Sequence, residues 1–385
     1  MNKKTILYIG GFEMPDRNAA AQRVLANAKA FRDLGYKVLL LGLSKDENNR
    51  NPSTYEGFDY LNIKYPTTFL EWLKYLTSIH QFNNYLKLNP SIIIAYNYPS
   101  IALNKLNNWG KKKGVKIISD STEWYQAKGN FIFRIIKNAD TYYRMKYVHL
   151  KLDGLIAISE YLFNYYSNKM QNVVKIPPLV DVKMNKWNSL NSLENSNNKN
   201  IKLVYAGSPG TGNKDRLDII LKLLSEIFIE NTSINFTFTI IGLTKKQLSS
   251  SFKVDVPENI KDKIIFKGRL SHINALNEIK KADYNLFLRD DNLVNKAGFP
   301  TKLVESITCG TPVLTNSTSN IKDYIDVGKS GFILDISTDN SLKESLINVL
   351  KLPKEKVNNM KAYSRNLNLF DYRNYLDQFR SLVIK

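Results

Sequence analysis

Short apolar runs alternate with amphipathic segments through the first half of the chain. The run TILYI at residues 5–9 ends in two glycines, and in the segment that follows Val24, Ala28 and Phe31 fall on one helical face. A second apolar run, VLLLGL, occupies residues 38–43. A strand, loop, helix and strand in this order form a βαβ unit, so the pattern predicts the start of a parallel sheet.

The alternation continues and then stops at a segment rich in Pro, Asn and Ser. Further strands are predicted at 91–97, 115–119 and 154–159, with helices at 99–113 and from Glu160. Residues 176–181 contain two prolines, and ten of the sixteen residues in 185–200 are Asn or Ser. Prolines interrupt regular structure and Asn/Ser runs are typical of linkers, so a first domain is predicted over residues 1–183.

The second half of the chain repeats the pattern of the first. Strands are predicted at 201–207, 234–242, 263–268, 284–288, 313–316 and 331–334, and helices from about Asp215 and at 272–281, 301–309, 339–352, 354–368 and 371–384. A second domain is therefore predicted over residues 201–368. Two such arrays predict an α/β protein with two Rossmann-like doubly wound domains that face each other across a cleft. Ligands are expected there, at the carboxyl ends of the strands.

Composition narrows the classes of function. The chain has 55 Lys and Arg against 35 Asp and Glu, a formal net charge of +20. Eleven basic and three acidic residues lie in 105–151 alone. Such a field attracts phosphates, nucleic acid or an anionic membrane, although a solvated lysine-rich surface explains it equally well. One cysteine and three scattered histidines indicate neither a disulfide framework nor a zinc site.

Two glycine-containing loops are candidates for binding phosphate. Gly11 lies in the loop that follows the first predicted strand. The segment from Gly207 through Ser208 to Lys214 lies between a predicted strand and a predicted helix. Glycine lets backbone N–H groups approach an anion, and Lys214 supplies a point charge. Neither loop matches the dinucleotide or Walker A patterns, so an ordinary tight turn or flexible loop remains the alternative for each.

The segment GFPTKLVES, residues 298–306, carries the strongest candidate site. Arg289 ends a strand, Gly298, Phe299 and Pro300 precede a predicted helix, and Thr301, Lys302 and Leu303 form its first turn. N–H groups at a helix start, together with Lys302, can seat a diphosphate. Glu305, one turn further, can accept hydrogen bonds from both ribose hydroxyls. Alone, the segment could equally be a helix with a surface Lys–Glu pair.

The order of these motifs resembles the GT-B glycosyltransferases, in particular the large retaining family 4 of bacterial polysaccharide assembly. The likeness covers nearly the whole chain, through the opening Gly-Gly, DSTEWY (120–125), AISEYL (157–162), YAGSPG (205–210) and AGFPTKLVESITCGTPV (297–313). It implies that the first domain binds an acceptor and the second a nucleotide sugar. It further implies that residues 369–385 form a helix that packs on the first domain.

The resemblance assigns roles residue by residue. Residues Thr301–Leu303 would hold the phosphates, Glu305 the ribose and Lys214 the diphosphate. Two positions depart from the family: Ser208 stands where an Arg is common, and Ala297 where a Glu often contacts the donor sugar. Arg289 is expected to replace the missing charge. Asn295 or the backbone of residues 297–300 is expected to meet the sugar.

Asp120 and Glu123 follow a strand of the first domain and are candidates for steering the acceptor hydroxyl or taking its proton. The alternative is that Asp120 or Ser121 caps the next helix. Lys214, Arg289 and Lys302 are cations suited to a diphosphate leaving group, so neither a metal nor another cofactor is expected.

The segment FIFRIIKNADTYYRMKYVHLKL, residues 131–152, mixes aromatic and basic residues, which suits an anionic membrane surface. A core helix with a basic edge is the alternative. The expected protein is cytoplasmic, with a peripheral contact on the inner face of the cell membrane, and transfers a hexose to a lipid-linked saccharide during capsule or lipopolysaccharide synthesis. A nucleotide-sugar 2-epimerase and a non-enzymatic membrane or nucleic-acid binder are competing hypotheses, although no nucleic-acid-binding motif is present.

Overall fold

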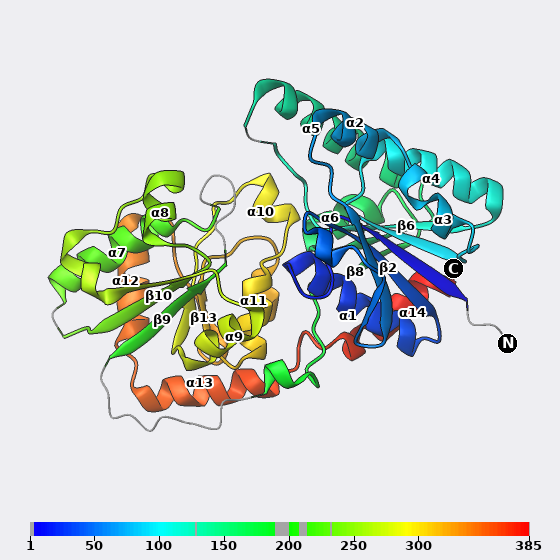
Figure 1. Ribbon diagram of the computed structural model, residues 1–385. Coiled ribbons are helices and arrows are strands. Elements are labelled where there is room, and N and C mark those ends of the chain that lie inside the picture. The colour runs from blue at the N-terminus through cyan, green and yellow to red at the C-terminus, as the bar shows by residue number, and fades with distance from the viewer. Residues whose placement is uncertain (1–3, 128, 189–199, 208–213, 232, 385) are drawn as a thin grey trace. The chain divides into compact units, whose positions relative to one another are not determined.

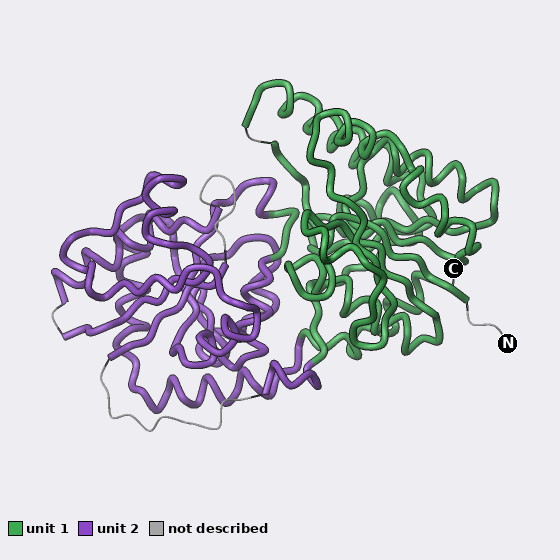
Figure 2. Tube along the Cα trace, in the orientation of Figure 1, with its two compact units in different colours: residues 1–181, 296–299, 370–385 green, residues 182–295, 300–369 purple. Residues whose placement is uncertain are grey.

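The computed structural model describes residues 4–127, 129–188, 200–207, 214–231 and 233–384. The chain divides into two compact units (Figure 2). Unit 1 comprises Met1–Asp181, Lys296–Phe299 and Phe370–Lys385, and unit 2 comprises Val182–Asn295 and Pro300–Leu369. The segment Lys296–Phe299 thus groups with unit 1, although its sequence neighbours belong to unit 2 and the predicted second domain included it.

Unit 1 is built on an eight-stranded sheet with the order β3-β4-β2-β1-β5-β6-β7-β8 (Figure 1). All neighbouring pairs are parallel except β3–β4, which is antiparallel. The strands are β1 (Thr5–Gly10), β2 (Lys37–Ser44), β3 (Ser53–Tyr55), β4 (Phe58–Lys64), β5 (Ile92–Tyr96), β6 (Lys116–Ser121), β7 (Gly154–Ala157) and β8 (Val173–Lys175). The parallel sheet expected from the sequence is confirmed, and β3, β4 and β8 are additions at its edges.

Helices cover both faces of this sheet. They are α1 (Ala19–Asp33), α2 (Phe69–Thr77), α3 (Asn83–Leu86), α4 (Ser100–Lys113), α5 (Phe131–Tyr143), α6 (Glu160–Ser167) and α14 (Leu376–Ile384). Alternation along β1 sends Ile6 and Tyr8 into a core shared with α1 and α14. Leu7 and Ile9 enter the opposite core, shared with α4. The sheet is therefore doubly wound, as expected.

The C-terminal helix belongs to this unit. Phe379 on α14 packs edge-to-face against Phe31 on α1, with 4.9 Å between ring centroids. Asn172 also donates a hydrogen bond to the carbonyl oxygen of Leu382 at 3.0 Å. These contacts lie within unit 1 and tie the end of the chain to its first helix.

Unit 2 has a six-stranded parallel sheet with the order β11-β10-β9-β12-β13-β14. The strands are β9 (Ile201–Ala206), β10 (Phe236–Ile241), β11 (Ile264–Gly268), β12 (Tyr284–Leu286), β13 (Val313–Thr315) and β14 (Gly331–Ile333). The helices are α7 (Leu217–Glu230), α8 (Lys245–Phe252), α9 (His272–Lys281), α10 (Leu293–Ala297), α11 (Thr301–Thr308), α12 (Asp339–Leu350) and α13 (Lys354–Asn366). The second Rossmann-like array is thereby confirmed.

The aromatic and basic segment 131–152 does not form one continuous helix. After α5 the chain widens into a π-helical turn, η3 (Arg144–Val148), and then tightens into a 3-10 turn, η4 (His149–Lys151). In α5 only Asp140 and Thr141 are buried, so the alternative of a core-packed helix is wrong for this part. Every helix in the described part of the chain is too short or too polar to cross a bilayer.

Candidate functional site

A cluster of buried charges lies at the carboxyl ends of the central strands of unit 2. Tyr205 is the penultimate residue of β9, Asp215 precedes α7, Arg289 follows β12, and Lys302 is the second residue of α11. Arg289 Nε lies 2.9 Å from Asp215 Oδ1, and the Lys302 ammonium pairs with Asp215 Oδ2. The Tyr205 hydroxyl donates to the same Oδ2 at 2.8 Å. The topology of the sheet therefore brings two of the predicted cations onto one carboxylate.

Burial makes the electrostatics of this cluster strong. The side chains of Asp215, Arg289 and Lys302 are 2%, 7% and 7% exposed. Burial raises the pKa of the Asp215 carboxyl, but Lys302 and Arg289 outweigh this, so the net pKa is lowered. Burial lowers the pKa of the Lys302 ammonium, although Asp215 opposes the shift. The carboxylate is thus held ionised between two cations.

The cluster has more positive than negative groups and one donor to spare. With one carboxylate and two cations, its net charge is +1 when both cations are protonated. Among the described residues, Arg289 Nη1 is buried without a hydrogen-bond partner. A buried guanidinium donor without an acceptor is unfavourable, so the cluster is suited to receive an anion.

The start of α11 adds backbone donors beside Lys302. Its N-cap is Pro300, which provides no side-chain cap, and Thr301 is half-buried. The N–H of Leu303 donates to the Pro300 carbonyl at 3.1 Å. The N–H of Leu303 is therefore already engaged, in contrast to the sequence prediction that all three N–H groups of residues 301–303 are available.

Gly207, the first residue of the glycine-rich loop, lies close to Lys302 of the cluster. A Cβ atom built on Gly207 would lie 3.4 Å from Lys302 Nζ, and the φ of Gly207 is +132°. The positive φ therefore favours glycine at this position, and the added Cβ atom itself would make only an ordinary contact with the lysine side chain. Ser208, a predicted donor residue, lies outside the described residues. Lys214 is half-buried and directly precedes Asp215 in the chain.

Glu305 is accompanied by a histidine that the sequence reasoning did not connect with it. His272 Nε2 lies 3.3 Å from Glu305 Oε1, and the two side chains are 14% and 18% exposed. The ring of Trp187 packs edge-on against His272 at 5.9 Å. His272 opens α9, and α9 packs beside α11. Only this helix pairing brings the two residues together, so sequence spacing carried no signal for it.

The residues before α11 make their contacts within unit 1 or with the loop after β12. Gly298 and Phe299 group with unit 1, where the Phe299 ring packs against Phe370 at 6.2 Å. The Ala297 carbonyl accepts a hydrogen bond from the Ser159 hydroxyl at 2.8 Å. In unit 2, the Asn295 amide donates to the carbonyl of Asp290 at 2.8 Å, and its Oδ1 is buried without a partner among the described residues.

Asp120 is enclosed within unit 1, which corrects the expectation that it faces a cleft. Its carboxylate is fully buried and binds Arg23 Nη2 at 2.7 Å and the Tyr8 hydroxyl at 2.5 Å. Asn27 also donates to it at 3.3 Å. The capping alternative is wrong as well, because Asn130 caps α5. Asp120 is therefore occupied in holding α1 against the sheet.

Glu123 and Gly11 are both accessible to solvent and can therefore contact a ligand. Glu123 is half-buried in the loop after β6, and its carboxylate forms no ion pair within the described part of the chain. Gly11 is exposed, and a Cβ atom there would meet nothing within 4 Å. The close backbone approach occurs one residue earlier, since a Cβ atom on Gly10 would lie 2.5 Å from the Tyr96 carbonyl. Among the described residues, no three His, Cys, Asp or Glu side chains converge as a metal site.

Comparison with known proteins finds a family match over part of the chain and a fold match over nearly all of it. Residues 193–367 match the family model described as glycosyl transferases group 1. No curated protein matches the chain in sequence. Among solved structures, sucrose-phosphate synthase from Thermosynechococcus elongatus is similar at 13% identity with a TM-score of 0.73, covering 99% of this chain and 98% of that one.

Two further solved structures have the same architecture. The lipopolysaccharide outer core galactosyltransferase WaaB is 15% identical with a TM-score of 0.62, covering 98% of this chain and 99% of that one. Anabaena HepE, solved in complex with UDP-glucose, is 13% identical with a TM-score of 0.65, covering 98% of both chains. These likenesses establish the fold. The chain therefore has the GT-B fold, and its residues 193–367 are similar to the glycosyl transferases group 1.

Proposed function

We propose that this glycosyltransferase moves a hexose from a nucleoside diphosphate sugar to a saccharide acceptor with retention of the anomeric configuration. The observation that carries the proposal is the buried cluster of unit 2, where Arg289 Nη1 has no partner among the described residues and two cations share Asp215. A diphosphate supplies the missing acceptors and balances the excess charge. The similar structures of WaaB, a galactosyltransferase, and of HepE in complex with UDP-glucose support a hexose donor.

The proposed chemistry uses groups of the chain to stabilise the leaving diphosphate. Arg289 and Lys302 contact the phosphates as the glycosidic bond to the anomeric carbon breaks, and Lys214 adds charge from the adjacent loop. Glu305 accepts the ribose hydroxyls. Because these cations come from the protein, the proposed reaction needs neither a divalent metal nor another cofactor. Retention without a protein nucleophile requires an acceptor hydroxyl held on the same face as the departing diphosphate. The acceptor oxygen then bonds to the anomeric carbon, and its proton passes to the phosphate oxygen that leaves.

The test is a thermal-shift screen of nucleoside diphosphates and their sugars, followed by a transfer assay with the donor that stabilises most. Stabilisation grows with the ratio of ligand concentration to Kd. We expect a nucleoside diphosphate hexose to raise the melting temperature, and NMR of the product to show the donor's anomeric configuration. An inverted product would contradict retention. Conversion of the free nucleotide sugar into its 2-epimer, without transfer, would contradict the transferase assignment.

We further propose that the acceptor is lipid-linked, that unit 1 contacts an anionic membrane on its cytoplasmic face, and that the reaction serves cell-surface polysaccharide synthesis. Helices α2 and α5 support this, because Trp72 and Phe133 stack at 5.4 Å between centroids and join the two helices. Beside this contact five large apolar side chains are exposed, at 53–77%: Phe69, Leu70, Phe131, Ile132 and Ile135. Exposed apolar residues near Arg and Lys suit a charged bilayer interface.

Vesicle co-sedimentation tests the membrane contact. We expect binding to vesicles of phosphatidylglycerol and phosphatidylcholine that weakens with salt, and little binding to vesicles of phosphatidylcholine alone. Replacing Phe131 and Ile132 by Ser should abolish binding while leaving nucleotide affinity unchanged, because both side chains are exposed in unit 1. Failure to bind anionic vesicles at low salt would refute the contact.

A further inference from the structure

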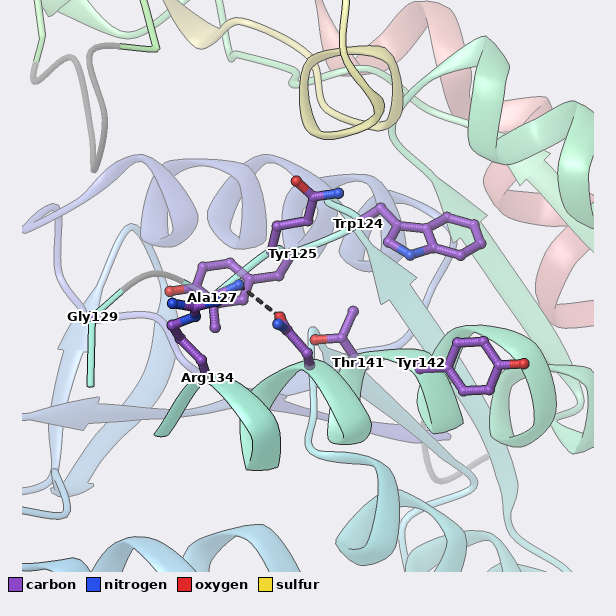
Figure 3. Close-up of a pocket in the computed structure, with 9 residues that line it drawn as sticks. Trp124, Tyr125, Ala127, Gly129, Arg134, Thr141 and Tyr142 are labelled. Atoms are coloured by element: carbon purple, nitrogen blue, oxygen red, sulfur yellow. Dashed lines mark hydrogen bonds between the residues drawn. The ribbon is translucent and has the colours of Figure 1, made fainter. Parts of the chain in front are cut away.

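Unit 1 contains a pocket that the donor chemistry does not use. Its volume is about 530 Å³, within the range of small-molecule sites. The pocket lies between α5 and the loop that follows β6 (Figure 3), and its lining comprises Trp124, Tyr125, Gln126, Ala127, Gly129, Arg134, Asn138, Thr141 and Tyr142. Arg134, Asn138 and Thr141 are spaced by four and three residues, so α5 presents one face to this loop.

The walls of the pocket are held in place by their own contacts. Asn138 Oδ1 accepts a hydrogen bond from the Ala127 backbone N–H at 2.8 Å, which fastens the loop to α5. Trp124 packs edge-on against Tyr165 at 5.1 Å, and the Lys146 ammonium lies 5.4 Å above the Trp124 ring. The aromatic wall is therefore positioned before any ligand arrives.

The polar groups of the pocket have unused hydrogen-bonding capacity. Thr141 is 2% exposed, and within the described residues its hydroxyl has no hydrogen-bond partner. The exposed guanidinium of Arg134 forms no ion pair with any residue that the structure describes. Lys137 lies 5.7 Å above the Tyr125 ring, but it is paired with Asp140 at 3.5 Å, so Arg134 is the cation that the pocket offers to a ligand. A buried hydroxyl without a partner indicates that a ligand or water completes the site.

We infer that this pocket binds a saccharide that carries an anionic group, as part of the acceptor. Aromatic rings pack against the apolar C–H face of a sugar, while Thr141 and Asn138 offer hydrogen-bonding groups to its hydroxyls. Arg134 pairs with a phosphate or carboxylate on the saccharide. The inference rests on the proposed function and narrows it by naming the chemical class of the acceptor.

The experiment measures binding of matched sugars by calorimetry, with UDP present at saturation so that the donor site is filled. The probes are methyl β-D-glucoside, its 6-phosphate, methyl β-D-glucuronide and inorganic phosphate. At low salt we expect one or both charged sugars to bind about threefold or more tightly than the neutral glucoside. The phosphate and glucuronide arms identify which anionic group the pocket prefers.

Three variants separate the pocket from general charge and from folding. Arg134→Gln should abolish the preference for charged sugars, whereas Lys112→Gln, which removes an exposed cation on α4, should leave it intact. Thr141→Val removes the buried hydroxyl at nearly constant volume and should weaken all sugars without lowering the melting temperature. A merely structural Thr141 would leave sugar affinity unchanged.

The outcomes distinguish this inference from the proposed function. Equal binding of neutral and charged sugars, insensitivity to Arg134→Gln, or inorganic phosphate binding as tightly as the sugar phosphate would each overturn the assignment. If UDP binds and no sugar does, the inference fails while the donor site stands. If UDP does not bind either, the proposed function itself fails.

Discussion

Each unit contains a buried carboxylate that accepts a hydrogen bond from a tyrosine, Tyr8 on β1 in unit 1 and Tyr205 on β9 in unit 2. The two clusters around these carboxylates differ in charge balance. In unit 1, Asp120 meets a single cation, Arg23, whose Nη1 also donates to the carbonyls of Ile176 and Pro177 at 3.0 and 2.9 Å. In unit 2, Asp215 meets two cations and Arg289 Nη1 has no partner among the described residues. The first cluster is closed and structural, and the second is open to an anion.

This contrast gives a rule for assigning roles to buried ion pairs. A carboxylate matched by one saturated cation has no unused donor with which to bind a ligand, whatever its position at the end of a strand. A carboxylate between two cations, one with an unused donor, requires a further anion to balance it.

The largest effect is expected from Asp120→Asn. The substitution leaves Arg23 buried without a counter-ion, and breaking such a pair costs about 3–5 kcal/mol in the free energy of unfolding. Urea unfolding followed by circular dichroism measures the loss. The control is Asp377→Asn, since Asp377 is 89% exposed in its ion pair on α14 and should change stability by less than about 0.5 kcal/mol. Equal losses in the two variants would contradict a structural role for Asp120.

A smaller loss, of about 2 kcal/mol, is expected from Asp215→Asn. Two cations are left without their carboxylate, but Lys302 can release a proton whereas Arg23 in unit 1 cannot. A nucleoside diphosphate should reduce the stability difference between wild type and Asp215→Asn. The stability difference between wild type and Asp120→Asn should be the same with and without the nucleotide. Thermal melting with and without UDP tests this, and a loss at Asp215 that UDP does not reverse would contradict an open cluster.

The same variant predicts a defined pH dependence. The pKa of Asp215 is lowered in the folded protein, so in the acid range the native state binds fewer protons than the unfolded chain, whose Asp pKa is about 3.9. The stabilisation by this carboxylate is therefore complete above that value and decreases as the pH falls towards the lowered pKa. The stability difference between wild type and Asp215→Asn should shrink as the pH falls below about 4. A difference that persists unchanged at pH 3 would contradict the assignment.

Removing one cation should give the Asp215 cluster the same ratio of one cation to one carboxylate as the Asp120 cluster. Lys302→Met leaves Asp215 and Arg289 as a one-to-one pair, so UDP affinity should fall about tenfold while the unfolding free energy changes less than in Asp120→Asn. Calorimetry and melting report the two effects. Lys322→Met, at an exposed position of unit 2, is the matched control. A large loss of stability with unchanged UDP affinity would make Lys302 structural.

The sequence predicted the strands and helices that carry both clusters, but it did not predict which charged residues pair with each other. Hydrophobic periodicity located β1, β9 and α11, and with them Tyr8, Tyr205 and Lys302, because alternating apolar runs follow directly from the geometry of strands and helices. Partner choice depends on tertiary packing. Arg23 reaches Asp120 across 97 positions and Lys302 reaches Asp215 across 87, so neither pair leaves a local signal. For the same reason Asp120 was expected in a cleft and His272 was not connected with Glu305.

The smallest expected effect concerns binding of the ribose. It tests whether the nucleotide-binding site extends along α11 from Lys302 to Glu305. Glu305 lies one turn beyond Thr301 and carries its own partner, His272 at 3.3 Å, so it can accept hydroxyls without disturbing Asp215. Glu305→Gln keeps the shape and removes the charge, and should weaken UDP by about 1 kcal/mol. The decisive comparison is between UDP and 2′-deoxy-UDP: wild type should prefer UDP, and the variant should lose that preference. If both proteins discriminate equally, the ribose is held elsewhere and the binding site ends at the phosphates.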